Sequence, residues 1–416
     1  MKRLIALWMA VMMMGVSFAR AESPTFNPRG EEAWYQAMLQ DAQVSLGSNL
    51  RLKKVIERAR AGEEITIAAI GGSITEGAGA KRPTECYVSR FAEGFRARYG
   101  ADGGANVHLI NAGVGGTPST FGIMRYERDI LAHVKDADNL PDLIIVEFAV
   151  NDGGEPTKHQ CYESLVKELL ELPNQPAVIL LFAVFWGGWN LQDELRRVGE
   201  TYDLMMVSIR DSAYPHVGQE WTKAEFFSDD YHPTSLGHGV MADCLLASVD
   251  AAAAAPDSAA DVRLDAEPAF GTAYMGLTRI FGDTEGLEQY SFDRGGFLHD
   301  DKQAYKTPSL GRVCGPNFAH RGEDGAAPLT FTATFSKLLI AWRSVKGEAY
   351  GRAQIRVDGK VVAIVGGKND SWGQSEVTLA YDGKTPVEHT VTIQPTTATE
   401  QKAFTVTGIA FSTAEN

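Results

Sequence analysis

The stretch that decides the fold reads ITIAAIGGSITEG and spans residues 65–77. It begins with a largely apolar run rich in isoleucine, which predicts a strand buried on both faces. The run ends in two glycines followed by Ser73. Strands of this kind belong to parallel sheets covered by helices, and such sheets bind ligands beyond the carboxyl ends of their strands. We therefore expect Ser73 at the edge of the sheet where function is located.

Similar apolar runs recur along the chain and alternate with stretches of helical period. The further strand candidates are residues 107–112, 143–150, 177–185 and 205–209. The helix candidates are residues 87–99, 122–134, 161–171, 191–202 and 235–255. Alternation of this type predicts an α/β domain with a doubly wound, parallel, five-stranded sheet.

A change in composition marks the end of this domain. The alanine run 251–255 is followed by Pro256, which breaks a helix. We place the boundary near Ala260, which gives an α/β domain over 22–260 and a second domain over 261–416. In the second domain, residues 329–335, 353–357, 360–365, 376–381, 389–393 and 404–411 read as strands. They predict an all-β, jelly-roll-like sandwich, and Asp358-Gly359 predicts a two-residue hairpin turn.

Composition and charge restrict the class of protein. The chain has 416 residues, of which 44% are hydrophobic, so it can bury a sizeable core and form two domains. Lys and Arg total 39 against 53 Asp and Glu, a net charge of -14, which argues against nucleic acid as a partner.

Residues 1–21 combine Lys2 and Arg3, an apolar run and Ala19-Arg20-Ala21, which predicts a signal peptide and a periplasmic or extracellular protein. The apolar run is shorter than the about 20 residues that span a bilayer, so we expect no membrane insertion.

The cysteines and histidines show no metal-binding pattern. Cys86, Cys161, Cys244 and Cys314 lie far apart and form no CxxC pair. After export they would meet an oxidising compartment, but a chain this long does not need disulfides, so none, one or two bridges stay open. The histidines lack metal-ligand spacing, and we expect no metal. The oligomeric state also stays open.

Ser73 is the candidate nucleophile. Flanking glycines allow a sharp turn that leaves the serine hydroxyl and its N–H open to a substrate. A phosphate-binding turn is a weak alternative because no Gly-Lys-Ser/Thr follows. A tight turn without chemistry is the other alternative, since a serine hydroxyl needs a base before it becomes a good nucleophile.

A base for Ser73 comes later in the same domain, in the run DDYHP that begins at Asp229. Asp229 precedes His232 by three residues, so in a turn it can accept the proton of one ring nitrogen and leave the other free. Pro233 favours extended backbone at His232, which should project from a loop. Asp230 is the competing acid. A loop or capping role is the alternative for His232.

Two other strand ends carry candidate donors for an oxyanion, each of which typically contributes a few kcal/mol in acyl transfer. The run NAGVGGT follows the second strand and offers the N–H of Gly116, with Gly113 and Gly115 as alternatives. The run AVND ends the third strand and offers the side-chain amide of Asn151. A helix cap is the alternative for Asn151, but Asp152 fits that role better.

Ser73, Gly116, Asn151 and His232 occur in the order and surroundings of the SGNH hydrolases, the GDSL-type esterases, which this chain resembles over roughly residues 60 to 250. The resemblance implies an SGNH/flavodoxin-like sheet. It also implies that Ser73 is the nucleophile and first oxyanion donor. Gly116 and Asn151 would be the second and third donors, and His232 the base that Asp229 orients.

The chain departs from the family pattern at two positions. Gly72 stands where the family commonly has aspartate, and Ala149 stands where it has glycine. Neither change removes a group with a catalytic role in the family. The opening Gly-Gly-Ser-Ile-Thr resembles that of secreted esterases that act on carbohydrate.

Two tryptophans follow the fourth strand. Trp186 and Trp189 would lie near the predicted site, where indole rings can stack on sugar rings. The alternative is that one or both pack against a neighbouring helix or the second domain.

These features predict a secreted serine esterase that removes acyl groups, above all acetyl, from a polysaccharide through an acyl-serine intermediate, without a cofactor. A lipid or aryl ester hydrolase with the same site is one alternative. It would require a long apolar channel, and the chain has no apolar lid segment. A non-catalytic carbohydrate-binding protein is the other alternative, although the complete set of candidate residues argues against it.

Overall fold

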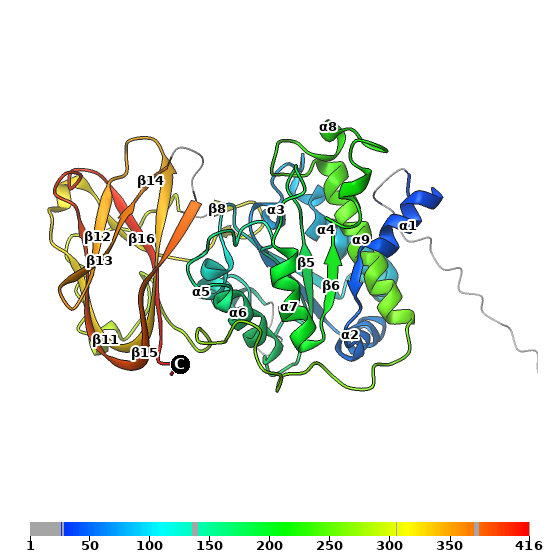
Figure 1. Cartoon of the computed structure of the whole chain (residues 1–416), viewed down its shortest axis with the longest axis horizontal. Helices are drawn as coiled ribbons and strands as arrows, with labels where there is room; N and C mark the ends of the chain where they lie inside the picture. Colours follow the sequence, from blue (N-terminus) through cyan, green and yellow to red (C-terminus); the bar gives the residue numbers. More distant parts are fainter. Residues whose placement is uncertain (1–25, 27–28, 135–139, 305, 370–373, 416) are drawn as a thin grey trace, which may run out of the picture.

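The computed structural model describes residues 26, 29–134, 140–304, 306–369 and 374–415. The predicted signal peptide, residues 1–21, lies outside the described residues. Figure 1 shows an α/β domain built around one sheet and, beside it, a C-terminal domain built of strands. No helix among the described residues is long and apolar enough to cross a membrane.

The sheet of the first domain confirms the five predicted parallel strands. They are β2 Ile65–Gly71, β3 Val107–Gly113, β4 Leu143–Glu147, β5 Ala177–Phe182 and β6 Met205–Ser208. A sixth, short strand that the sequence did not predict, β1 Gln43–Ser45, pairs antiparallel with β6. The strand order is β1-β6-β5-β4-β2-β3, so β2 lies between β3 and β4. The carboxyl ends of β2, β3 and β4 are thereby neighbours.

Helices cover both faces of this sheet (Figure 1). One face is covered by α1 Ala33–Asp41, α2 Leu50–Arg60, α4 Tyr87–Tyr99 and α9 Ser235–Ala254. The other face is covered by α5 Ser119–Asp129, α6 Gln160–Leu170 and α7 Gln192–Tyr202. Two short helices are α3 Ser73–Glu76 and α8 Lys223–Phe226. Turns of 3-10 helix lie at Pro83–Glu85, Asp102–Gly104, Leu131–His133, Tyr214–His216, Leu287–Tyr290 and Gly322–Asp324.

The C-terminal domain is the antiparallel β domain that the sequence predicted. Its main strands are β7 Thr278–Ile280, β10 Phe318–His320, β11 Leu329–Lys346, β12 Arg352–Val357, β13 Lys360–Gly366, β15 Gln374–Pro395 and β16 Phe404–Ser412. Shorter strands are β8 Lys306–Thr307, β9 Gly311–Arg312 and β14 Lys368–Asn369. The main path of the large sheet is β10-β16-β11-β15-β12-β13, and its strands enclose one apolar core.

Two predictions about these strands need correction. The runs predicted at 376–381 and 389–393 belong to one strand, β15, and β11 continues well beyond the predicted end at residue 335. The pairing of β11 with β15 shifts register between Phe335 and Lys337 and again between Leu338 and Leu339. Each irregularity changes which side chains face the core, so the strand continues where its alternation breaks. The predicted hairpin turn is confirmed, with positive φ at both Asp358 and Gly359.

The two domains share an apolar contact. Phe121 and Met124 of α5 belong to the same buried cluster as Tyr274, Phe281 and Leu339 from the C-terminal part of the chain. Such a contact holds the domains in a fixed relation more strongly than a polar linker would. The boundary near Ala260 stays a prediction.

The cysteines form no disulfide. All four, Cys86, Cys161, Cys244 and Cys314, are described, buried and unbridged. The sequence left open no, one or two disulfide bridges, and the structure has none.

Candidate active site

Ser73 begins the short helix α3 directly after β2, at the carboxyl edge of the sheet. Gly71 and Gly77 allow this sharp connection. A side chain at Gly71 would meet Thr75 Oγ1 at 2.2 Å and the Glu147 carbonyl oxygen at 2.5 Å, and Gly77 has a φ of 110°. Glycine is thus required sterically at one position and conformationally at the other. The turn leaves Ser73 at the wall of a cavity.

The structure joins Ser73, His232 and Asp229 in one chain of hydrogen bonds. His232 Nε2 lies 2.9 Å from Ser73 Oγ, and His232 Nδ1 lies 2.8 Å from Asp229 Oδ2. The Asp229 carboxylate also accepts the backbone N–H groups of Tyr231 and His232, at 2.7 and 2.8 Å. A serine, a histidine and a carboxylate in this arrangement can transfer the serine proton to the imidazole.

The geometry distinguishes Asp229 from Asp230. Asp230 forms an ion pair with Lys223, and its side chain is 63% exposed. Partial burial acts to raise the pKa of Asp229, but hydrogen bonds from the His232 ring and from the Tyr231 and His232 amides outweigh it and hold that pKa below its ordinary value. Asp229 therefore remains ionised beside the imidazole.

The loop after β3 separates the three glycines that the sequence offered as oxyanion donors. The Gly113 N–H donates to Asn111 Oδ1 at 3.0 Å, and the Gly115 N–H donates to Glu76 Oε2 at 2.7 Å. Gly116 lines the cavity with a φ of 67°. The amides of Gly113 and Gly115 are thus engaged by side chains, which favours Gly116 for a ligand.

Glu76, which the sequence analysis did not select, supports this loop. Burial raises the pKa of Glu76, while its hydrogen bond from Gly115 and the nearby charges of Arg125 and His232 oppose the rise. Its carboxylate ties α3, which begins with Ser73, to the loop that carries Gly116. The position of Glu76 three residues after Ser73, on the first helical turn, is the sequence signal that was available.

Asn151 lies directly over Gly72. A Cβ atom at Gly72 would lie 2.2 Å from Asn151 Oδ1 and 2.6 Å from its Cγ, much closer than any real contact. Asn151 lines the cavity with Ser73. The glycine that replaces the aspartate of the related sequences is therefore sterically required in this chain.

Substituting Gly72→Ala should lower kcat for ester hydrolysis at least tenfold, because the methyl group must displace Asn151 and loss of one oxyanion donor typically costs about 10²- to 10³-fold. Initial rates with an aryl acetate would measure the effect. Gly366→Ala is the matched control, since a Cβ there has its closest contact at 3.9 Å. Equal rates for both variants would show that the amide over Gly72 does not assist the reaction.

The four residues Ser73, Gly116, Asn151 and His232 all line one cavity of about 360 Å³. The structure thus brings together side chains and loops that lie up to 159 positions apart in sequence. The cavity is open to solvent along one side, and its outer walls come from two further parts of the chain.

One outer wall is aromatic. Phe185 and Tyr231 line the cavity, and their rings meet edge to face with centroids 5.1 Å apart. Tyr231 is 43% exposed and lies next to His232, with ring centroids 6.2 Å apart. The sequence analysis missed both residues. Their signal was proximity, since Phe185 ends a predicted strand and Tyr231 lies within DDYHP.

The two predicted tryptophans lie behind this wall. Trp189 stacks on Phe185 with centroids 5.7 Å apart, and its ring covers Gly153, which lines the cavity. Trp186 packs edge-on against Tyr214 and Phe227. Among the described residues that line the cavity, neither tryptophan appears. Trp189 thus lies at the rim of the cavity. Trp186 packs against neighbouring aromatic side chains, which was the alternative to a sugar contact.

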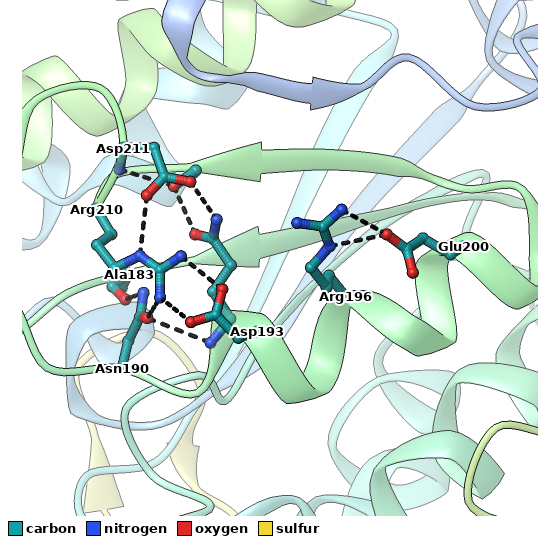
Figure 2. A network of polar contacts seen from close by, with 9 residues as sticks. Ala183, Asn190, Asp193, Arg196, Glu200, Arg210 and Asp211 are labelled. Atoms are coloured by element: carbon teal, nitrogen blue, oxygen red, sulfur yellow. Dashed lines mark hydrogen bonds and ion pairs between the residues drawn. The ribbon is translucent and has the colours of Figure 1, made fainter.

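A polar network holds the turn that carries these aromatic residues, residues 185–189 (Figure 2). Asn190 Nδ2 donates to the Ala183 carbonyl oxygen at 2.8 Å, and Arg210 donates to Asn190 and bidentately to Asp193. The hydrogen bond from Arg210 holds the pKa of Asp193 below its ordinary value. The network fixes the start and end of the turn, so Phe185 and Trp189 have a defined position.

The other outer wall comes from the C-terminal domain. Residues 375–377 at the start of β15 line the same cavity as Ser73. Ser375 is buried, and Val377 packs against the cluster that the two domains share. No sequence pattern indicates this contact, because it depends on how the domains pack.

Two carboxyl groups are buried beneath the site. Burial raises the pKa of Glu147 to about 8 and that of Asp152 to about 7. The Thr75 hydroxyl donates to Glu147 Oε2 at 3.1 Å, and the Ser119 N–H donates to Asp152 Oδ1 at 2.7 Å. Among the described residues, no group of three or more His, Cys, Asp and Glu side chains is arranged to hold a metal.

The raised pKa of Glu147 predicts a pH-dependent gain in stability for Glu147→Gln. Between an unfolded pKa near 4.3 and the folded pKa of about 8, the folded protein retains a proton that the unfolded chain releases, so this contribution to stability falls as pH rises. Glutamine does not ionise. We expect the free energy of unfolding of Glu147→Gln, relative to wild type, to increase by up to about 1.4 kcal/mol per pH unit between pH 5 and 8.

Urea unfolding at pH 5, 6, 7 and 8 measures this difference. The exposed Glu93→Gln is the control, for which the difference from wild type should stay constant. A constant difference for Glu147→Gln as well would mean that Glu147 is ionised in the folded protein.

Comparison with known proteins agrees with this fold. Residues 69–240 match the sequence model of the GDSL-like Lipase/Acylhydrolase family. Two crystal structures of a two-domain esterase (CEX) active on acetylated mannans, one co-crystallised with mannopentaose, are each 27% identical to this chain with a TM-score of 0.77. The matches cover 91% of this chain and 98% and 99% of theirs. Curated protein sequences give no match.

Serine hydrolases use a serine at a strand end of the sheet that is hydrogen-bonded to a histidine, which is in turn hydrogen-bonded to an aspartate. Residues 69–240, which match the GDSL-like lipase/acylhydrolase family, contain all three of these residues. The two-domain architecture of the chain is that of the esterase structures.

Proposed function

We propose that the protein is an exported serine esterase that removes acetyl groups from the hydroxyls of a polysaccharide. The observation that carries the proposal is the hydrogen-bonded chain Ser73, His232 and Asp229 on the wall of an open cavity. The signal-peptide pattern of residues 1–21 supports export, to the periplasm or beyond.

In the acylation step, Ser73 Oγ attacks the ester carbonyl carbon while His232 Nε2 accepts the hydroxyl proton. Asp229 holds the ring and stabilises the imidazolium that forms. The N–H groups of Ser73 and Gly116 and the side-chain amide of Asn151 stabilise the tetrahedral oxyanion. The imidazolium then protonates the departing sugar oxygen, which leaves an acyl group on Ser73.

In the deacylation step, His232 takes a proton from water, and the resulting hydroxide attacks the acyl carbonyl carbon. The oxyanion forms in the same place and collapses with cleavage of the bond to Ser73 Oγ, which takes the proton back from His232 as acetate leaves. Each step requires only groups that the chain supplies.

The cavity walls support a polysaccharide substrate. An aromatic wall at Phe185 and Tyr231, with Trp189 at the rim, offers ring faces suited to sugar rings. Residues 375–377 of the C-terminal domain also line the cavity, so a chain that lies across Ser73 would contact both domains. Because similar two-domain esterases are active on acetylated mannans, we propose an acetylated mannan as the substrate.

Two sets of rates test this proposal. The first compares 4-nitrophenyl acetate with 4-nitrophenyl octanoate, and the second measures acetate release from acetylated mannan, xylan and pectin. We expect acetate to be preferred over octanoate and mannan to be the best polymer. A preference for octanoate would favour a lipid or aryl esterase, and glycan binding without cleavage of any ester would favour a binding protein.

A further inference from the structure

Arg125 is a fully buried arginine beneath the site that the proposed chemistry does not use. It lies on α5 with 0% of its surface exposed. Its guanidinium donates to the carbonyl oxygens of Ala112 at 2.7 Å and of Gly71 at 3.1 Å. A buried charge is costly unless it is paired and hydrogen-bonded, so these contacts indicate a defined role.

The two carbonyl groups belong to the strand ends that position the site. Gly71 ends β2 and lies two residues before Ser73, and Ala112 lies next to the end of β3 and four residues before Gly116. One guanidinium therefore bridges the segment that carries the nucleophile and the segment that carries an oxyanion donor, in addition to the backbone pairing of β2 with β3.

The same arginine is tied to the C-terminal domain. Arg125 Nη1 lies 3.0 Å from Asp129 Oδ2, and Asp129 Oδ1 accepts the backbone N–H of Cys314 at 2.9 Å. Asp129 and Cys314 are both buried. Cys314 has a φ of 61°, a conformation that non-glycine residues rarely adopt. The segment is thus held in a specific shape against Asp129.

Three ion pairs between the two parts of the chain lie away from the strand ends. Arg128 pairs with Asp283 near the surface, and Arg279 pairs with Glu127 and Glu168. These pairs fix the position of the second domain, but they do not contact β2 or β3. Variants of these pairs are therefore controls that disturb the domain contact without disturbing the strand ends.

We propose that Arg125 and Asp129 are positioning residues that couple the docking of the C-terminal domain to the geometry of the active site. The hydrogen bond from the Cys314 N–H to Asp129 orients the Arg125 guanidinium, which in turn holds the ends of β2 and β3. The proposal rests on the proposed esterase function, in which Ser73 and Gly116 act on one carbonyl group. A small displacement between them lowers the rate without removing a catalytic group.

The double variant Arg125→Met with Asp129→Leu tests the coupling. Exchange of a buried ion pair for apolar side chains of similar volume often preserves stability, so this variant should fold. We expect kcat for 4-nitrophenyl acetate to fall about 10- to 100-fold, with KM within about twofold of wild type. Asp283→Asn, which removes the surface pair, should leave both constants within about twofold.

Hydrogen exchange measured by mass spectrometry provides a readout that does not depend on activity. In the double variant, backbone amides should exchange faster than in wild type in peptides that cover residues 71–77, 112–117 and 312–318. If the double variant does not fold, the more conservative Asp129→Asn takes its place, with the same expected result. Exchange elsewhere should be unchanged. Wild-type exchange in these peptides, or unchanged kcat in a folded double variant, would overturn the proposal.

The two readouts separate this proposal from the esterase proposal. If the wild-type protein cleaves no ester, the proposed function fails, and the exchange data alone decide whether Asp129 couples the domains to the strand ends. If the wild-type protein is active and the folded variant equals it, only the coupling fails.

Discussion

Substituting Ser73→Ala should lower kcat for 4-nitrophenyl acetate by about 10⁴- to 10⁶-fold, the loss typical when a serine hydrolase loses its nucleophile. The physical reason is the position of Ser73 Oγ, 2.9 Å from His232 Nε2 on the cavity wall. Removal of one hydroxyl should leave the thermal unfolding midpoint within a few degrees of wild type. Initial rates and a thermal melt on the same preparation measure both quantities.

Covalent labelling adds an independent check on Ser73. A fluorophosphonate should modify the wild-type protein once, and peptide mass spectrometry should locate the label on Ser73. Ser89→Ala, which changes a serine on α4, should retain wild-type rates and labelling. A Ser73→Ala variant that remains active, or a label on another serine, would refute the assignment of the nucleophile.

Substituting His232→Ala should produce a loss of similar size, about 10⁴- to 10⁶-fold in kcat, because it removes the base that lies 2.9 Å from the Ser73 hydroxyl. Added imidazole should restore part of the activity, since the variant leaves space beside Ser73 for a free base. The rate should then increase with imidazole concentration. Steady-state rates with and without imidazole measure the rescue.

A matched pair of aspartate variants completes this test. Asp229→Asn should lower kcat at least 100-fold because the His232 ring loses the carboxylate that orients it. Similar changes in other triads lower kcat by up to about 10⁴-fold. Asp230→Asn should stay within about twofold, since Asp230 pairs with Lys223 at the surface. Equal effects of the two substitutions, or a fully active His232→Ala, would contradict the proposed base.

The α/β domain was predictable because its strands have strong local signals. Buried parallel strands read as continuous apolar runs, and every such run fell on an observed strand. The edge strand β1 was not predictable in this way, because three residues carry no periodicity. The helix α2 was missed although Leu52, Val55, Ile56 and Ala59 are spaced as one buried helical face.

The C-terminal domain was harder to predict in detail. Its strands β11 and β15 continue through irregularities that reverse the alternation of buried and exposed residues, so one strand reads as two. The second half of β11 is also buried on both faces, because Leu339 and Ala341 pack against the α/β domain. Alternation along a sequence does not reveal a face that another domain covers.

In the candidate site, too, residues in short local motifs were predictable from the sequence, whereas residues that reach the site through folding were not. Ser73, Asn151 and Asp229 with His232 stand in short runs at strand ends or loops, and local chemistry was enough to select them. Residues 375–377 reach the cavity only through domain packing, and nothing in their sequence indicates a site. Arg125 likewise shows its contacts with Gly71 and Ala112 only in the folded chain.

The most direct test of the proposed function is acetate release from acetylated mannan by the wild-type protein and by Ser73→Ala at equal concentration. We predict steady release by wild type and no detectable release by the folded variant. Absence of release from mannan, xylan and pectin while 4-nitrophenyl acetate is cleaved would contradict the polysaccharide substrate. Equal release by wild type and Ser73→Ala would contradict the serine mechanism itself.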